Sequence, residues 1–350
     1  MTLITPDLDV SRALLQAGRD PLAAEVAGAL ESRCDIEPGA RLLVGFSGGP
    51  DSTALLILLL ALSEHATPPC GRPEVLHVDH GLRDASAEEA AHVLEMCRAL
   101  DVSCSVVRLD LDAGSPDLSR RARDARYDAL EARARELGCD AVVVAHHAED
   151  RLESILQALC RGSGVKGLSS PRWTRALGAT RLVRPLLGTS RSQLLEFCRR
   201  LDLPHVHDPT NERLDTARGL LRSGVMDILE TRWPGAALRA SAAADRAGAA
   251  AIALEQQLEI LFGPSDRRSW TRDHLRGIEL ELIAAGLRRA LTFRAPDRGD
   301  AIPASRLLQI ARASADDVVH PRRFELPGGW IIEIDAARVE LHESVHSEGG

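Results

Sequence analysis

Residues 41–201 alternate repeatedly between a short apolar run and a longer helical segment, and this alternation limits the fold more than any other feature of the chain. The runs that we expect to form strands cover residues 41–46, 74–80, 104–111, 140–147 and 180–187. The helical segments that follow them cover residues 52–65, 86–100, 118–137, 151–161 and 190–201. Apolar strands separated by helices are typical of parallel sheets that helices cover on both faces. The pattern therefore predicts an α/β fold built on a doubly wound, parallel, five-stranded sheet.

Beyond about residue 220 the alternation stops and helical segments follow one another. We expect helices over residues 216–231, 235–262, 273–293 and 303–315. The tail "FELPGGWIIEIDAARVEL" alternates apolar and polar residues around a Gly-Gly turn, which is typical of a β-hairpin. The sequence thus predicts two domains, an α/β domain over residues 1–220 and a mainly helical domain over residues 221–345 that ends in a hairpin.

Composition favours a cytoplasmic protein without a membrane partner. The longest apolar run, residues 54–62, is far shorter than the roughly 20 residues needed to cross a bilayer. The N-terminal "MTLITPDLDV" lacks the basic and then apolar layout of a signal peptide. The cysteines never occur as C-x-x-C, so they indicate neither a disulfide framework nor a zinc site.

The stretch "GFSGGPDS", residues 45–52, follows the first expected strand and allows several interpretations. It satisfies G-x-S-x-G, but a hydrolase elbow needs further strands and an oxyanion loop ahead of the serine. A Walker P-loop is excluded because no lysine lies near it. A glycine-rich turn without a ligand remains an alternative.

A pyrophosphate-binding loop fits the residues better. Gly48 and Gly49 let the backbone approach a ligand, and successive N–H groups at a helix N-terminus attract phosphate. Ser47 and Ser52 add hydroxyl donors, and Asp51 offers a carboxylate to Mg²⁺. Ser-Gly-Gly-x-Asp-Ser, placed between a strand and a helix, resembles the signature of the PP-loop ATP pyrophosphatases. These enzymes split ATP into AMP and pyrophosphate to adenylate a carbonyl group.

Motifs later in the chain indicate one particular family within this superfamily. In chain order they are "HVDHGLR" (77–83), "ARDARY" (122–127), "AHHAED" (145–150), "RGSGVKGL" (161–168), "RPLL" (184–187) and "DPTN" (208–211). Together with the glycine-rich loop, they resemble the tRNA(Ile)-lysidine synthases over roughly residues 39–235. The later helices and the "LPGG" hairpin resemble the second domain of that family more loosely.

The resemblance implies a ligase that uses ATP and Mg²⁺ and acts on tRNA(Ile) with a CAU anticodon. C2 of the wobble cytidine is adenylated, and the amine of L-lysine then displaces AMP. The α/β domain would bind ATP and catalyse the reaction, and the helical domain would bind tRNA. The sequence leaves the oligomeric state open, with a homodimer as one alternative.

The resemblance also implies roles for particular residues, carried over by matching position. The catalytic residues would be Asp51, His146 and Asp150. Asp51 would bind Mg²⁺, and Asp150 would act as a second ligand or as a general base. The residues implied to bind ATP are Ser47, Gly48, Gly49, Pro50, Asp51, Ser52 and Arg123. Those implied to contact substrate or tRNA are Asp79, His80, Arg83, Arg126, Glu153, Arg161, Arg184, Asp208, Asn211 and Arg222.

Three residues depart from the pattern of the family. Glu149 replaces an aspartate, Arg151 is expected to insert a cation beside the catalytic centre, and Gly219 removes an asparagine amide. The alternatives are a tRNA thiolase of the same superfamily and a degenerate RNA-binding homologue. A thiolase needs paired cysteines, and a protein that only binds RNA has no need of a pyrophosphate loop.

The charge distribution is compatible with a polyanionic partner. The chain carries a net charge of −8, yet residues 161–246 contain more basic than acidic groups. A basic block on an acidic chain can be a footprint for nucleic acid or a solvated surface. Charge alone does not separate these alternatives.

Overall fold

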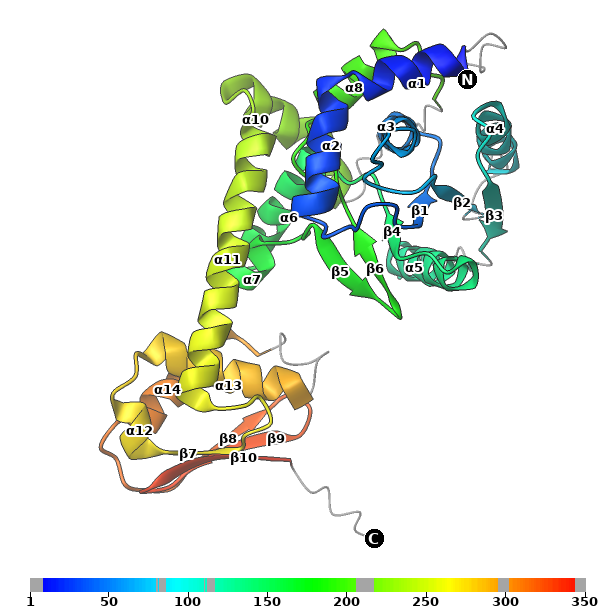
Figure 1. The fold of residues 1–350 in the computed structure, drawn as a ribbon. Helices are drawn as coiled ribbons and strands as arrows, with labels where there is room; N and C mark the ends of the chain where they lie inside the picture. The colour runs from blue at the N-terminus through cyan, green and yellow to red at the C-terminus, as the bar shows by residue number, and fades with distance from the viewer. Residues whose placement is uncertain are drawn as a thin grey trace. The chain divides into compact units, whose positions relative to one another are not determined.

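The computed structural model describes residues 9–79, 81, 86–109, 111, 117–205, 217–294 and 302–343. The chain divides into two compact units, Met1–Gly248 and Ala249–Gly350 (Figure 1). The division lies inside the helix α11 (Ala236–Phe262), whereas the sequence predicts a boundary near residue 220. The assignment of functional domains to 1–220 and 221–345 stays a prediction. Within the described ranges, none of the helices combines the length and apolar character that crossing a membrane requires.

The first unit is built on a mostly parallel sheet of six strands, and it confirms the predicted α/β class. All five predicted strands are present, but a sixth, antiparallel strand makes the predicted number of five wrong. The sixth strand, β5, pairs with β6 at one edge, so the strand order is β3-β2-β1-β4-β6-β5. The strands are β1 (Leu42–Gly45), β2 (Glu74–Asp79), β3 (Cys104–Arg108), β4 (Ala141–Val143), β5 (Thr174–Leu177) and β6 (Thr180–Val183).

Helices cover both faces of this sheet because successive strand residues point to opposite sides. In β1, Leu42 and Val44 join one hydrophobic core and Leu43 joins another. Five helices contribute to the first core: α1 (Val10–Gly18), α2 (Pro21–Ser32), α3 (Pro50–Ser63), α4 (Ser86–Ala99) and α8 (Arg191–Arg200). The second core is closed by α5 (Leu118–Leu137), while α4 packs on β2 and β3. The helices α1 and α2 are absent from the sequence prediction.

The strand order reverses between β1 and β4, and this reversal indicates where on the sheet a ligand would bind. After β1 the chain continues to β2 and β3 on one side, whereas β4 and β6 lie on the other. In doubly wound sheets, ligands bind at the carboxyl ends of the strands beside such a reversal. Residues 46–49 follow β1 and residues 144–147 follow β4 at this edge.

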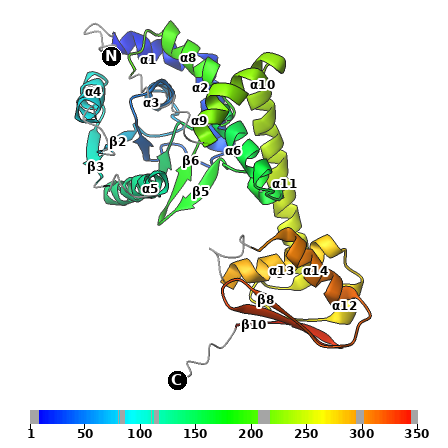
Figure 2. The same cartoon turned by 180° about the vertical axis from the view of Figure 1, so that it is seen from behind.

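The remaining elements of this unit are helical, and Figure 2 shows them from behind. They are α6 (Ala148–Cys160), α7 (Val165–Leu168), α9 (Ala217–Leu220), the π-helix η2 (Leu221–Val225), α10 (Met226–Arg232) and the first part of α11. A small core of Ala148, Leu152, Met226 and Ala237 packs α6 against α10 and α11. This contact brings η2, which directly precedes α10, close to the start of α6.

The second unit combines helices with an antiparallel four-stranded sheet of order β7-β10-β9-β8. The predicted hairpin is present as β8 and β9, with Gly328 and Gly329 at positive φ in the turn, and the sheet continues beyond β9 with β10 and then β7. The predicted helix over 273–293 is two helices that separate near Gly277. The elements are β7 (Ser269–Thr271), α12 (Arg272–Arg276), α13 (Leu280–Arg294), α14 (Ala304–Ala315), β8 (Arg322–Leu326), β9 (Trp330–Ile334) and β10 (Arg338–Glu343).

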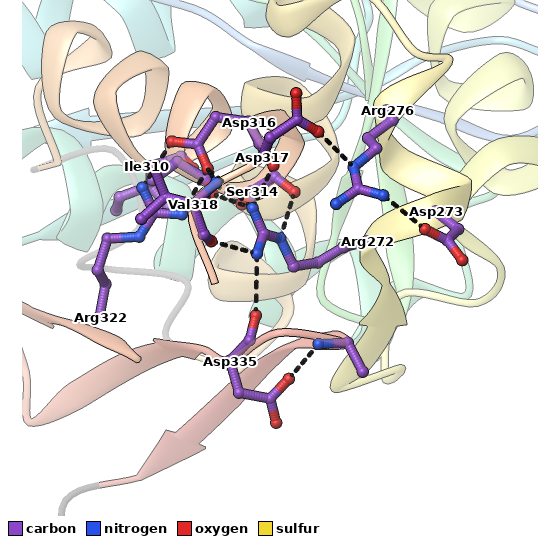
Figure 3. A network of polar contacts seen from close by, with 12 residues as sticks. Arg272, Asp273, Arg276, Ile310, Ser314, Asp316, Asp317, Val318, Arg322 and Asp335 are labelled. Atoms are coloured by element: carbon purple, nitrogen blue, oxygen red, sulfur yellow. Dashed lines mark hydrogen bonds and ion pairs between the residues drawn. The ribbon is translucent and has the colours of Figure 1, made fainter. Parts of the chain in front are cut away.

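Arg272 is the polar centre of this second unit, and Figure 3 shows its contacts. Its side chain is 1% exposed, and it donates to the carbonyl oxygens of Ser314 at 3.2 Å, Val318 at 2.6 Å and Asp335 at 3.1 Å. Its Nη2 also lies 2.8 Å from Asp316 Oδ1. Because buried charges must be paired and hydrogen-bonded to be tolerated, this one side chain ties α12 to the end of α14 and to β9.

Asp316 makes the stability of this unit sensitive to acid. Hydrogen bonds from Arg322 lower the pKa of Asp316 from its ordinary 3.8 to about 2. The folded state therefore favours the ionised carboxylate, so the stabilisation is present above pH 3.8 and is lost as the pH falls toward about 2. We expect urea unfolding followed by circular dichroism to show this loss in the wild type and less of it in Asp316→Asn. The control is Asp317→Asn, whose carboxylate is fully exposed; equal pH slopes for both variants would contradict the assignment.

Candidate active site

The loop between β1 and α3 presents free backbone donors to the carboxyl edge of the sheet. Gly48 has φ +78°, a left-handed conformation that side chains other than glycine rarely adopt. Gly49 caps α3 without a side-chain hydrogen bond, so the first N–H groups of that helix are available to a ligand. Pro50 begins the helix, which suits a position whose N–H would have no intrahelical partner.

Two hydroxyl groups hold the loop in this shape. Ser47 Oγ and Ser52 Oγ are 3.0 Å apart, and Ser52 Oγ donates to the carbonyl oxygen of Gly49 at 2.9 Å. Ser47 Oγ also accepts from the Gly49 N–H at 3.4 Å. The loop is therefore already closed around the start of α3, and its amides can bind an anion without a large rearrangement.

Asp51 stands in the first turn of α3, beside the end of β4. Its side chain is 27% exposed, and its Oδ2 lies 3.6 Å from Nε2 of His147. The other oxygen, Oδ1, is buried and has no hydrogen-bond partner in the described part of the chain. A buried carboxylate oxygen without a donor carries a desolvation penalty that a bound cation would remove.

His147 joins three carboxylates, and sequence reasoning missed it. Its Nε2 lies 3.5 Å from Asp150 Oδ2 in addition to Asp51, and its Nδ1 lies 2.9 Å from Glu149 Oε2. Burial by itself disfavours the charged imidazolium, but Asp150, Asp51 and Glu149 outweigh it and raise the pKa of His147 to about 10. His147 is therefore a cation that neutralises the acidic groups around it. The adjacent pair of histidines was the available signal, but the sequence prediction chose His146.

Arg222 occupies the far side of the same acidic group. Its Nη2 lies 2.6 Å from Asp150 Oδ1, and its Nε lies 2.9 Å from Glu153 Oε2. Both carboxylates are buried, at 6% and 2% exposure. Burial would lower the pKa of Arg222, but Asp150 and Glu153 raise it above its ordinary value. Arg222 belongs to the π-helix η2, and single π-turns of this kind are frequent at functional sites.

His146 has a different polar environment from His147. Arg184 Nε donates to His146 Nδ1 at 3.0 Å, and Arg184 Nη1 donates to the carbonyl oxygen of Arg172 at 2.8 Å. Because Nδ1 accepts this bond, the proton of the neutral ring lies on Nε2. The predicted catalytic role of His146 stays a prediction. At the end of β4, Asp51 and Asp150 both lie beside His147.

The other predicted residues fall into three groups. Asp79 accepts from the Gly81 N–H at 2.7 Å at the end of β2, and Arg161 is exposed at the end of α6. Burial would raise the pKa of Asp79, but hydrogen bonds and the nearby Arg108 lower it. Arg123 and Arg126 lie together on α5. His80, Arg83, Asp208 and Asn211 lie outside the described residues.

The expectation that Arg151 inserts a cation beside the centre is wrong. Its guanidinium points to α11, where Nη2 lies 2.7 Å from Asp245 Oδ1 and Nη1 donates to Ser241 Oγ at 3.0 Å. It also stacks 5.8 Å from the ring centroid of Trp173. Arg151 therefore fixes α6 to α11. The long side chain carries its charge away from Asp150, although the two residues are adjacent in sequence.

The arrangement combines an anion-binding loop with a group of carboxylates at one sheet edge. Among the described residues, no group of three or more His, Cys, Asp or Glu is arranged to hold a metal ion by itself. Mg²⁺ is commonly held by one or two carboxylates together with substrate phosphates, so the residues present fit that mode. The geometry suits chemistry on a phosphate-bearing nucleotide. The roles given to single residues stay predictions.

Comparisons with known proteins agree with this geometry. Residues 22–229 match the model of the PP-loop domain family. A tRNA(Ile)-lysidine synthase from Pseudomonas syringae pv. tomato is 38% identical over 213 residues, which cover 61% of this chain and 47% of that protein. One from Parasynechococcus marenigrum is 34% identical over 307 residues, covering 86% of this chain and 88% of that protein. The chain thus spans about half the length of the Pseudomonas relatives it matches.

A solved structure is similar in fold. A U34-tRNA thiolase from Methanococcus maripaludis, solved with its [4Fe-4S] cluster, aligns with a TM-score of 0.55 at 18% identity. The alignment covers 68% of this chain and 79% of the thiolase. At this identity the likeness supports the fold alone. The matches in sequence are the stronger finding, and the chain therefore belongs to the PP-loop domain family and, within it, to the tRNA(Ile)-lysidine synthase family.

Proposed function

We propose that the chain is a carbon–nitrogen ligase that converts the wobble cytidine of a CAU anticodon in tRNA(Ile) to lysidine. The C2 oxygen of cytidine attacks the α-phosphorus of ATP, and pyrophosphate leaves. The amine of L-lysine then attacks C2, and AMP leaves with the former C2 oxygen. One observation carries the proposal. The glycine loop after β1 and the residues after β4 lie together at the same edge of the sheet, where His147 lies between Asp51 and Asp150. Such an enzyme acts where tRNA is, so we also propose a cytoplasmic location.

Each part of the first step has residues to support it. The amides of Gly48 and Gly49, with the hydroxyls of Ser47 and Ser52, would bind the β- and γ-phosphates. Asp51, with Asp150 as a second ligand, would hold Mg²⁺, which neutralises negative charge on the leaving pyrophosphate. Oδ1 of Asp51 supports this assignment, because it is buried and accepts no hydrogen bond from the residues that the structure describes.

The second step needs an amine that has lost a proton. Asp150 or Glu153 could accept that proton, since a general base must lie within hydrogen-bond reach of the group it deprotonates. Both carboxylates already bind a cation of similar charge, the guanidinium of Arg222. This supports an acidic site for L-lysine near Asp150 and Glu153, and Arg222 would have to share or leave that site.

The cysteines argue against sulfur transfer as the alternative. All seven are free, and five of them are buried. Cys34, Cys70 and Cys198 lie in the core that contains α3, and burial raises the pKa of Cys70 and Cys198 to about 12. Thiols that remain protonated inside a core are poor nucleophiles and poor cluster ligands.

Mass spectrometry of the modified nucleoside tests the proposal. We expect tRNA(Ile) with a CAU anticodon, incubated with the full chain, ATP, Mg²⁺ and L-lysine, to gain the mass of lysine less water on cytidine. AMP should form in equal amount, and omission of lysine should abolish the mass change. A product that forms without lysine but requires a sulfur donor would overturn the proposal in favour of a thiolase.

A further inference from the structure

A buried ion pair connects α6, the helix that carries two carboxylates of the candidate active site, to α11. Arg151 of α6 is 1% exposed, and its Nη2 lies 2.7 Å from Oδ1 of Asp245, a residue of α11. Its Nη1 donates to Ser241 Oγ at 3.0 Å, and Ser241 Oγ donates in turn to the carbonyl oxygen of Leu187 at 2.6 Å. The two helices lie side by side (Figure 2). We call Arg151 and Asp245 the α6–α11 anchor.

Trp173 covers the anchor on another side. Its indole N–H donates to Asp245 Oδ1 at 2.8 Å, so this one oxygen accepts from both Trp173 and Arg151. The guanidinium carbon of Arg151 lies 5.8 Å from the centroid of the Trp173 ring. Burial lowers the pKa of Arg151, and Asp245 opposes that shift. Asp245 therefore compensates the buried cation, and removing its carboxylate would leave Arg151 without this partner.

Arg151 and the active-site carboxylates lie on different sides of α6. Successive residues of a helix point about 100° apart, so Asp150 and Glu153, which are three positions apart, share a side that Arg151 does not. Asp150 and Glu153 face Arg222, whose Nη2 and Nε lie 2.6 Å and 2.9 Å from their respective oxygens. Arg151 faces α11. The same turn of α6 is therefore held by one arginine on each side.

The two arginines differ in what the proposed reaction requires of them. Arg222 binds the same carboxylates that we propose for L-lysine, so it has to share or leave that site when lysine binds. When it moves, Asp150 and Glu153 lose a contact that holds them in place. Arg151 is paired with a carboxylate outside this acidic site, so its contacts with α11 can persist throughout the reaction.

We propose that the α6–α11 anchor positions the carboxylates of Asp150 and Glu153 for the binding of L-lysine. The inference rests on the proposed function, which supplies the amine. An amine reacts efficiently only when it is held in line with the carbon that it attacks, so the turn of α6 that carries both carboxylates has to stay fixed. Arg151 and Asp245 act through α6, and they are therefore positioning residues rather than catalytic ones.

A double substitution tests the anchor without leaving a buried charge. In the full chain, Arg151→Met combined with Asp245→Asn removes both charges, and apolar residues of similar volume often replace a buried ion pair without loss of stability. We expect the KM for L-lysine to rise about tenfold, which corresponds to weakening one hydrogen bond to a charged group. Exchange of labelled pyrophosphate into ATP in the presence of tRNA should change far less, because it depends on the glycine loop and on Asp51 of α3.

Three single variants separate positioning from stability. Arg33→Met is the matched control, because Arg33 lies 3.7 Å from the other oxygen of Asp245 but its side chain is 54% exposed; its KM should equal that of the wild type. Arg151→Lys keeps a cation beside Asp245 and should restore most of the lysine affinity that the double variant loses. Trp173→Phe keeps an aromatic ring and removes only the donor to Asp245, so it should raise the same KM by a smaller factor.

Two results would overturn the anchor. The first is a KM for L-lysine that is the same in the double variant, in Trp173→Phe and in Arg33→Met. The second is an equal loss of pyrophosphate exchange and of the lysine step, because this would indicate a general loss of structure instead of misplaced carboxylates. Failure of the wild type to form lysidine would refute the proposed function itself. Lysidine formation by the wild type with an unchanged KM in the double variant would retain the function and refute the anchor alone.

Discussion

Replacing Asp51 with alanine is expected to abolish formation of AMP and pyrophosphate while leaving RNA binding nearly intact. Asp51 is the acidic residue in the first turn of α3, beside the glycine loop, and one of its oxygens is buried without a hydrogen-bond partner among the described residues. Loss of one group that stabilises developing charge typically slows a reaction roughly 10²–10³-fold. We expect at least a loss of that size, measured as tRNA-dependent release of AMP and as exchange of labelled pyrophosphate into ATP.

Two further variants define what the Asp51 result means. Asp51→Asn keeps the shape of the side chain and removes its charge, so it should be about as inactive as Asp51→Ala if a cation is the partner. Asp128→Ala removes an exposed aspartate of α5 and should retain activity. AMP release near the wild-type rate in Asp51→Ala would eliminate the metal role assigned to this carboxylate.

Replacing Arg272 with methionine is expected to lower the free energy of unfolding of the second unit by about 3–5 kcal/mol. The arginine is fully buried and donates to several backbone carbonyl oxygens between Ala313 and Asp335. Methionine fills much of the volume but offers no donor. The carbonyl groups and Asp316 would then be buried with fewer partners, and that desolvation is the main cost.

A neighbouring arginine gives the control for this experiment. Arg276 is on the same short helix, and it pairs with the exposed carboxylates of Asp273 and Asp317 (Figure 3). Surface ion pairs contribute about 0–1 kcal/mol, so Arg276→Met should unfold at nearly the urea concentration of the wild type. Equal losses in the two variants would show that the buried network is not what holds α12 in place.

The sequence predicted the α/β core well because that core depends on local pattern. The central parallel strands β1 and β4 are buried on both faces and therefore appear as apolar runs, which can be detected in the sequence. The helices α1 and α2 were missed although capping signals were present. Asp9 accepts a hydrogen bond from the N–H of Arg12 at the start of α1. Asp20, which directly precedes Pro21, accepts one from the N–H of Leu22 at the start of α2. Aspartate caps and a proline in the first turn are readable signals for a helix start.

The candidate site was predicted in part, for a similar reason. The shape of the glycine loop follows from consecutive residues, so its ligating groups could be named from the sequence. The choice between His146 and His147 depends on Asp51, which lies far away in the chain and meets His147 only in the folded sheet. The direction of the Arg151 side chain depends likewise on Asp245, a residue of α11. Contacts of this kind leave no periodic signal.

The short strand β5 has a consequence for the solubility of the protein. Without it, β6 would be the edge of the sheet, and its backbone groups would be free to pair with a strand from another molecule. Leu182 and Val183 of β6 are fully buried in the two cores of the sheet, so the strand at that edge would be apolar. A brief strand that exposes Arg175 and Ala176 covers this edge, so an internal deletion of residues 174–177 would uncover the backbone of β6 and favour association between molecules.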